Sequence, residues 1–387
     1  MSYTIEMFYR FVVEYNTDYP ILLLTNMRID HGCTMKNKKQ RSQKKWSKPM
    51  EKEEIRIKSA IVHILDSTIA MPVLSDTLLD HGSDFGDFLR SHIHRIITSD
   101  EIRSCSFQKE ESSIYHLLME YKEDDFTQIT QKIAGELFQI MNQNADIPPA
   151  DLIVVHYEVL EEPYMALLKM NYKTSYTHLT DSDPWGNSND IILQKAILPT
   201  QNQRLSEAAL ISLQDFSIQL LEKKYDINGA KVNYFSTMFL KCVGTMSPKT
   251  KLSIITKAVE DIQKKYYPES EQFEVHMESK SILNQELAEE GIISIPKVAE
   301  KLFVEHEEMK QEFEEKLEKY HLNEGEVMPK NPNTTKKFER QHLTTDTGIE
   351  IKIPMEQYNN KESVEFITNS DGTISVLLKN IGRIVSK

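Results

Sequence analysis

The sequence has few cysteines and no long apolar run. Its three cysteines, Cys33, Cys105 and Cys242, are widely spaced and form no CxxC pair. A disulfide framework or a zinc site is therefore not expected, and a reducing compartment is the simple interpretation. The longest apolar run near the start, Ile21 to Leu24, is far too short to span a membrane, and no signal-peptide pattern occurs. We expect a cytoplasmic protein.

The chain also has fewer basic than acidic residues. The chain of 387 residues has 46 Lys and Arg against 59 Asp and Glu, which gives a net charge of -13. This balance opposes unspecific binding of nucleic acid or anionic membrane over the whole surface. A nucleic-acid role would need a segregated basic patch. The length suggests two or three domains, and the apolar content of 40% is enough to build their cores.

Signatures of catalysis or metal binding are weak. His81, His92 and His94 lie near one another, but residues two apart on a helix do not face each other, so surface or packing roles are expected. The polar stretch 180–190 contains Asp181, Asp183 and Asp190, which would suit Mg²⁺ or Ca²⁺ and phosphodiester cleavage. It lacks the EF-hand order and a second carboxylate cluster, so we expect a solvated loop, with no enzymatic activity, cofactor or metal.

Residues 1–49 differ from the rest of the chain. They begin with several aromatic residues and then turn basic, without an acidic residue between His31 and Pro49. They hold nine basic and four acidic residues, which leaves 37 against 55 from Met50 onward, a net charge of -18. A basic arm that contacts phosphates is one interpretation. A solvated tail, or a start codon assigned upstream of Met50, is the alternative.

The next part of the chain alternates strand and helix patterns. A strand is expected from Ile55, and helices are expected over 85–97 and from Asp124 or Asp125 to about Asn144. Further strands are expected at 151–160, 164–172, 191–198, 208–213 and 216–221, and we expect them to form one antiparallel sheet. Residues 226–244 carry one helical stripe, formed by Phe235, Met238, Phe239 and Cys242. They predict a central core helix, capped by Asn228 and ended by Gly244.

Helical patterns dominate the following residues. Ser247-Pro248 begins one helix, a short one runs from Leu283 to Glu289, and Ser294 caps another that continues to Tyr320. The end alternates as strands, with a hairpin turn at 369–372. The predicted fold is α+β, with an antiparallel sheet in a mixed N-terminal part, a helical middle and a small C-terminal β unit. The predicted boundaries are 1–49 (basic and aromatic extension), 50–225 (α+β domain), 226–323 (helical region), 324–346 (polar linker) and 347–387 (β unit).

Several segments resemble one bacterial family. Residues 57–66 (IKSAIVHILD) resemble the opening strand of the YejK- or NdpA-like nucleoid-associated proteins. Residues 229–240 (GAKVNYFSTMFL) are similar to the family's central Gly-x-Lys-Val segment, and the hairpin 152–168 and the β-rich end from Ile349 match in order. The resemblance covers roughly Glu54 to Arg383. It implies association with the nucleoid and DNA binding, without known enzymatic chemistry.

The resemblance directs attention to clustered cations. The candidate DNA-binding residues are Lys330, Lys336, Lys337 and Arg340 in the predicted linker, together with Lys38, Lys39, Arg41, Lys44 and Lys45 in the extension. A solvated linker is the alternative for the first four. No motif that reads base sequence is visible, so we expect non-specific binding to the backbone of double-stranded DNA. The alternative function is an adaptor that joins nucleoid or DNA-metabolism proteins without touching DNA.

Overall fold

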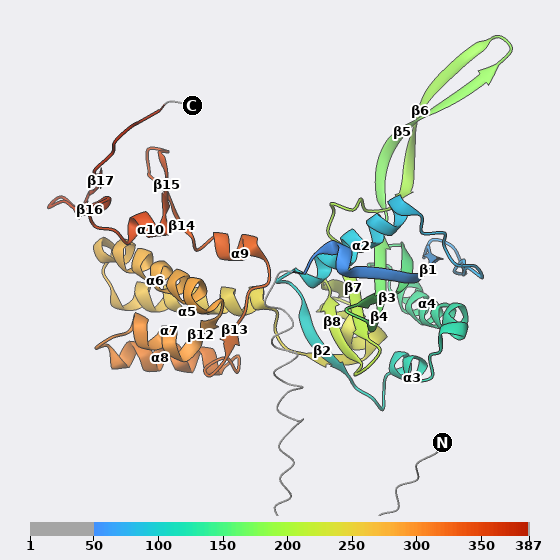
Figure 1. The fold of residues 1–387 in the computed structure, drawn as a ribbon, viewed down its shortest axis with the longest axis horizontal. Coiled ribbons are helices and arrows are strands. Elements are labelled where there is room, and N and C mark those ends of the chain that lie inside the picture. The colour runs from blue at the N-terminus through green and yellow to red at the C-terminus, as the bar shows by residue number, and fades with distance from the viewer. Residues whose placement is uncertain (1–49, 386–387) are drawn as a thin grey trace, which may run out of the picture. The chain divides into compact units, whose positions relative to one another are not determined.

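A computed structural model describes residues 50–385 of the chain (Figure 1). The extension 1–49, with its five candidate cations, lies outside the described residues. The elements of the first part are η1 (Lys52–Glu54), β1 (Ile55–Leu65), α2 (Ser83–Ile97), β2 (Arg103–Phe107), α3 (Ser113–Met119), η2 (Glu123–Asp125), α4 (Phe126–Gln143), β3 (Ala150–Val159), β4 (Glu162–Asn171), β5 (Lys173–Asp183), β6 (Gly186–Ile197), β7 (Glu207–Ser212), β8 (Ser217–Leu221), β9 (Tyr225–Ile227), β10 (Ala230–Val232), η3 (Phe235–Leu240) and β11 (Cys242–Gly244).

The second part is mainly helical and ends in short strands. Its elements are α5 (Pro248–Tyr266), α6 (Glu269–Glu290), β12 (Ile293–Ser294), α7 (Ile295–Leu302), α8 (Glu307–Glu318), β13 (Glu326–Val327), α9 (Pro332–Lys336), β14 (Arg340–Thr344), β15 (Glu350–Pro354), α10 (Met355–Tyr358), β16 (Val364–Thr368) and β17 (Ile374–Leu378). The predicted α+β class is confirmed. Among the described helices, none is long and apolar enough to cross a membrane.

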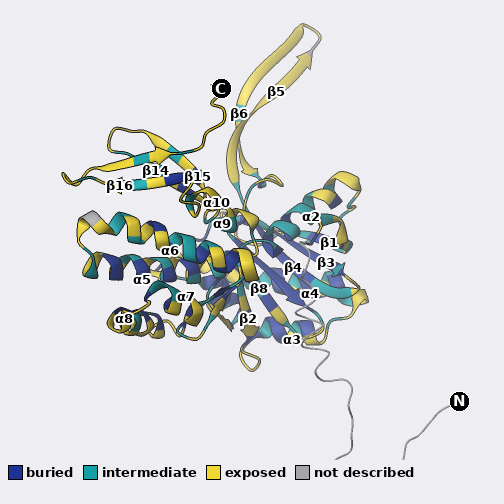
Figure 2. Ribbon diagram, turned by 60° about the vertical axis from the view of Figure 1, so that its left-hand side comes forward, coloured by how far each residue is buried: buried dark blue, intermediate teal, exposed yellow. Residues whose placement is uncertain are grey.

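Seven antiparallel strands form the central sheet, in the order β1-β3-β4-β7-β8-β2-β11. Helix α2 packs on one face, while α3, α4 and η3 cover the other. Strand β3 is a nearly continuous apolar run in the sequence, and its position in the sheet explains why. Leu152 and Val154 enter one core, whereas Ile153 and Val155 enter the opposite one. A strand buried on both faces has no polar side, and β3 and β4 are accordingly dark blue in Figure 2.

The prediction of a long central helix over 226–244 is wrong. Asn228 (φ 52°) and Gly229 (φ 79°) instead form the turn of the β9–β10 hairpin, because both residues accept the left-handed conformation that such turns require. A six-residue π-helix, η3, follows. Gly244 lies opposite Cys105 in the pairing of β11 with β2. The stripe is nevertheless buried, since Phe235 and Phe239 are at most 1% exposed within the core beneath α4.

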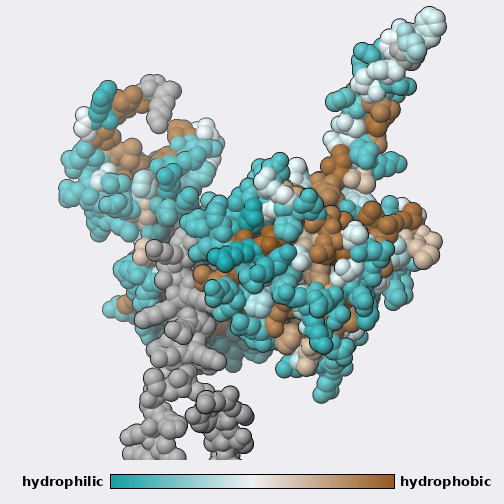
Figure 3. All heavy atoms as spheres, turned by 45° about the vertical axis from the view of Figure 1, so that its right-hand side comes forward, coloured by the Kyte–Doolittle hydropathy of each residue, from teal (hydrophilic) through white to brown (hydrophobic). Residues whose placement is uncertain are grey.

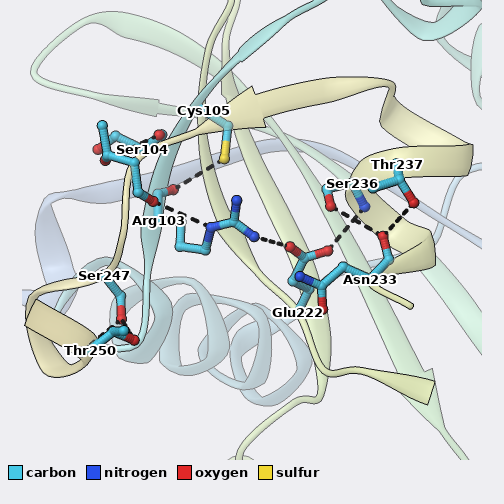
Figure 4. A network of polar contacts seen from close by, with 10 residues as sticks. Arg103, Ser104, Cys105, Glu222, Asn233, Ser236, Thr237, Ser247 and Thr250 are labelled. Atoms are coloured by element: carbon cyan, nitrogen blue, oxygen red, sulfur yellow. Dashed lines mark hydrogen bonds and ion pairs between the residues drawn. The ribbon is translucent and has the colours of Figure 1, made fainter. Parts of the chain in front are cut away.

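A polar network joins this stretch to the sheet (Figure 4). The Glu222 carboxylate accepts a hydrogen bond from Nη1 of Arg103 on β2 and another, of 3.0 Å, from the backbone N–H of Ser236 in η3. Arg103 Nε also donates to the Thr245 carbonyl. The Glu222 side chain is only 2% exposed, and burial raises its pKa although Arg103 and Ser236 oppose that shift. One buried carboxylate thus links β2, β8 and η3.

Strands β5 and β6 form a separate two-stranded arm that projects beyond the sheet (Figure 1). The stretch 180–190, predicted as a solvated loop, contains the end of β5, a turn at Pro184-Trp185 and the start of β6. The predicted strand at 191–198 does exist, but it pairs with β5 and not with the main sheet. The strands predicted around β7 and β8 do pair in the main sheet.

The helices of the second part surround their own apolar core. Ser247 caps α5 by accepting from the N–H of Thr250 at 3.3 Å, and Pro248 stands at the first helical position, as predicted. Helix α6 ends before Gly291 (φ 70°), close to the predicted end at Glu289, but it begins at Glu269 and is much longer than predicted. The single helix expected from Ser294 to Tyr320 is two helices, α7 and α8, because the chain breaks near Glu305 (φ 64°).

The C-terminal strands form two hairpins, β14–β15 and β16–β17. The predicted turn at 369–372 joins β16 and β17, with Gly372 at φ 84°. The stretch 324–346, predicted as a polar linker, contains β13, α9 and β14. Two of the candidate cations, Lys336 in α9 and Arg340 in β14, therefore lie on defined secondary structure, and the other two flank α9.

Candidate nucleic-acid interface

The structure brings the four described candidate cations onto one short segment. We call residues 330–340 the basic segment. Lys330 precedes α9, Lys336 ends it, Lys337 is its C-cap residue and Arg340 begins β14. All four residues are exposed. Within residues 50–385, Lys336, Lys337 and Arg340 enter no ion pair, so their charges are not neutralised by a neighbouring carboxylate. Glu339 is the one acidic residue in the segment.

A buried carboxylate positions the start of the basic segment. Asp100, which is 4% exposed, accepts the backbone N–H groups of Lys330 and Asn331 on its Oδ1, the second at 3.2 Å. Asn331 then caps α9, because its own Oδ1 accepts the N–H of Asn333 at 2.9 Å. Hydrogen bonds that involve a charged acceptor are stronger than neutral ones. The segment is therefore tied to the turn that follows α2.

The far end of the basic segment is held against α6. The Gln341 side chain, 1% exposed, donates to the Met277 carbonyl at 3.0 Å. Lys280 Nζ donates to the carbonyl of Arg340 at 2.8 Å. These bonds hold the backbone of β14 while the side chain of Arg340 stays exposed to solvent. The charged side chains thus stand on an anchored backbone.

A polar hollow of about 500 Å³ adjoins the segment. Asn331 and Asn333 form part of its wall, and the rest comes from α2, the turn after it, η1, the residues before β7 and the end of β8. Its ionisable lining consists of three cations, two histidines and two acids: Lys52, Arg95 and Arg204, His92 and His94, and Asp87 and Glu101. Most of its remaining lining residues carry hydroxyl or amide groups. Such groups are donors that bind phosphate oxygens in protein–DNA complexes.

The two acids of the hollow are already paired. Lys52 lies 3.8 Å from Asp87, and Arg204 lies 3.1 Å from Glu101, which also binds Lys249 at 2.6 Å. Lys249 and Arg204 lower the pKa of Glu101, and the hydrogen bond from Lys249 has the largest effect. Arg95 forms no ion pair within the described part of the chain, and its Nε is buried without a hydrogen-bond partner. Arg95 is therefore the cation of the hollow that is left to meet an anion.

Sequence reasoning found the basic segment but missed the hollow. The run of cations in 330–340 is visible as a local excess of charge. Lys52, Arg95 and Arg204 come from three distant stretches and lie together only after folding. The alternative carboxylate site is not assembled, since Asp181 pairs with Ser188 and Asp190 with Leu179 at different levels of the arm. The described residues contain no group of three or more His, Cys, Asp and Glu side chains that would hold a metal.

The comparisons with known proteins agree with the resemblance seen in the sequence. A search of curated proteins finds no match to this chain. A family model described as nucleoid-associated protein YejK matches residues 61–384, which include nearly the whole sheet, the helical part and the basic segment. The chain therefore belongs to the YejK family of nucleoid-associated proteins.

Proposed function

We propose that this nucleoid-associated protein binds double-stranded DNA directly and without sequence preference, by contacts to the phosphate backbone. The observation that carries the proposal is the group of un-neutralised cations, Lys336, Lys337 and Arg340, on an anchored segment beside the hollow that contains Arg95. A chain with a net charge of -13 repels DNA over most of its surface. Binding therefore has to be confined to such a patch.

Backbone contact fits these residues better than base readout. Lysine and arginine side chains bind phosphates regardless of sequence, and amide and hydroxyl groups add further contacts to them. Helix α9 has only five residues, too few to lie along a major groove as a recognition helix does. We therefore propose a binding role and not a catalytic one, with location on the nucleoid following from DNA contact.

The salt dependence of binding tests this proposal. Contacts from Lys336, Lys337, Arg340 and Arg95 would give a log–log slope of about -3.6, at about -0.9 per phosphate contact. Affinity for a random-sequence duplex should then fall roughly 150-fold between about 50 mM and 200 mM salt. Fluorescence anisotropy with the full-length protein measures this slope. Tight binding that ignores salt would contradict the proposal.

A triple variant locates the contacts. Replacing Lys336, Lys337 and Arg340 with Ala should weaken binding at low salt and reduce the slope to about -0.9. A matched control replaces Lys224, Lys257 and Lys264, three exposed lysines that form no ion pair within residues 50–385. Both triples lower the net charge equally, so only the position of the charge differs. Equal loss in both variants would refute the assignment to the basic segment. An absence of DNA binding in the wild type, with partners still captured from nuclease-treated lysate, would favour the adaptor role.

A further inference from the structure

The β5–β6 arm is a large excursion between two strands that are already neighbours. Strands β4 and β7 pair antiparallel from Tyr164 opposite Ser212 to Lys169 opposite Glu207. A turn of a few residues could join them. The chain instead uses residues 172–206, and the two arm strands of 11 and 12 residues reach roughly 36 Å at about 3.3 Å per residue. Such an extension is not needed to complete the sheet.

The arm carries apolar side chains that the rest of the described chain does not cover. Tyr176 is 72% exposed, Ile191 65% and Leu193 46%. Figure 3 shows hydrophobic residues along the arm, and Figure 2 shows both of its strands as exposed. An isolated two-stranded hairpin is at best marginally stable in water. Exposed apolar groups on such a ribbon therefore point to a contact with another molecule.

The pairing register sorts the arm into two different faces. Residues directly opposite each other in a ribbon share a face. Tyr176 faces Leu193 and His178 faces Ile191, and further out Thr180 and Ser182 pair across to Asn189 and Asn187, each with a side-chain hydrogen bond of 2.8 Å. We call this the uncharged face, since no Asp, Glu, Lys or Arg lies on it over residues 176–182 and 187–193.

The opposite face of the arm is acidic. It contains Asp181 and Asp190, with Leu179 directly across from Asp190. Leu179 is also exposed, at 53%. Two copies of this face would bring carboxylates together, which opposes self-contact. The carboxylates of this face would also repel DNA.

A buried polar network fixes the base of the arm. Lys169 and Glu207 are fully buried, 3.8 Å apart, and Asn171 bridges them by donating to Glu207 Oε2 at 2.9 Å and accepting from Lys169. One residue further, the Tyr172 hydroxyl donates to Asp151 Oδ1 at 2.6 Å. The strands therefore leave the sheet from an anchored position. A segment held in this way presents its faces in a defined direction.

We propose that the arm joins two copies of this chain, with the uncharged face of one arm packed against the same face of the other. A two-fold contact requires a surface that is complementary to itself. An apolar stripe flanked by neutral Thr, Ser and Asn side chains meets this requirement, because its own copy brings no like charge against it. The apolar part of this face is small compared with the roughly 800 Å² per partner of standard stable interfaces. We therefore expect a weak dimer, with a dissociation constant on the order of micromolar.

Sedimentation velocity on the full-length, nuclease-treated protein tests the contact from roughly 1 to 100 μM, the range in which a micromolar dimer forms and dissociates. The wild type should shift from monomer to dimer. Ile191→Asp should weaken the dimer at least tenfold, while the matched variant Leu179→Asp, on the acidic face, should keep it. Both side chains are exposed, so neither change disturbs a core.

Two results would overturn the proposal. One is a wild type that stays monomeric throughout this range, which would leave the arm to a different partner. The other is an equal loss of dimer in Leu179→Asp and Ile191→Asp. Removal of DNA beforehand separates this result from the proposed DNA binding, because a nucleic-acid bridge between copies is then absent.

Discussion

Replacing Asp100 tests whether DNA binding depends on the position of the basic segment as well as on its charge. The Oδ1 of Asp100 accepts the backbone N–H groups of Lys330 and Asn331, and Asp100 lies buried beneath the start of the basic segment. Asp100→Ala leaves both donors without this acceptor. Asp100→Asn keeps an oxygen in its place. Both variants make the chain one unit less negative, so any difference between them cannot arise from net charge.

The expected effect follows from the strength of these bonds. A hydrogen bond to a charged group contributes about 1.5–3 kcal/mol, so the loss of both shifts the docking equilibrium of the segment by a factor of at least about 150, of which only the part that undocks the segment lowers DNA affinity. Apparent affinity falls in proportion as the binding-competent fraction falls. We expect DNA affinity to drop about 3- to 10-fold in Asp100→Ala, although simple electrostatics predicts a gain. Asp100→Asn should bind at least as well as the wild type.

Anisotropy titration at low salt measures the affinities, and hydrogen exchange at the N–H groups of Lys330 and Asn331 reports docking directly. Faster exchange is expected in Asp100→Ala alone. Circular dichroism checks that the fold is retained. Equal or tighter DNA binding by Asp100→Ala, with its segment undocked, would refute the view that these cations must be positioned.

Two further predictions concern the fold. Burial lowers the pKa of His63 and His92 to about 4, so the unfolded chain binds more protons between about pH 4 and 6.5 and acidification destabilises the fold. The cost is about 2 kcal/mol per histidine at pH 5, and ring titration by NMR near pH 6.5 would contradict it. In Gly244→Ala the new Cβ would lie 2.2 Å from Cys105 Sγ, so we expect a loss of about 1–3 kcal/mol in urea unfolding. Gly135→Ala, in open space on α4, should be neutral or stabilising, and equal stability of the two variants would refute the steric argument.

Local signals in the sequence correctly predicted the ends of elements where one side chain fixes the backbone conformation. Ser247-Pro248 marks the start of α5 because a cap and a fixed φ act within a few residues. The same kind of signal was misread at Asn228-Gly229, where two left-handed residues make a hairpin turn and not a helix cap. The apolar stripe after it is buried as expected. Tertiary packing shortens it to η3, since the chain must return to the sheet as β11.

The candidate site was only half visible for a related reason. Cations that are adjacent in the sequence, such as Lys336 and Lys337, can be recognised without a structure. The hollow depends on Arg95, which looks like an ordinary polar position on the amphipathic helix α2, and on residues far away in the chain. The strand at 191–198 was predicted, but its pairing with β5 in a separate arm was missed, because alternation becomes visible only when one face is buried and both faces of β5 and β6 are exposed.

The position of β2 in the sheet has a consequence for synthesis of the protein. It lies between β8 and β11, and its Arg103 bonds to Glu222 and Thr245, which follow it by 119 and 142 residues. While the chain grows on a ribosome, β2 emerges long before either neighbour exists. One hydrogen-bonding edge of β2 stays open until β8 has emerged, and the other stays open until β11, which ends at Gly244, has emerged as well. Nascent chains that stop short of that residue present an unpaired strand, and such products are natural substrates for chaperones and proteases.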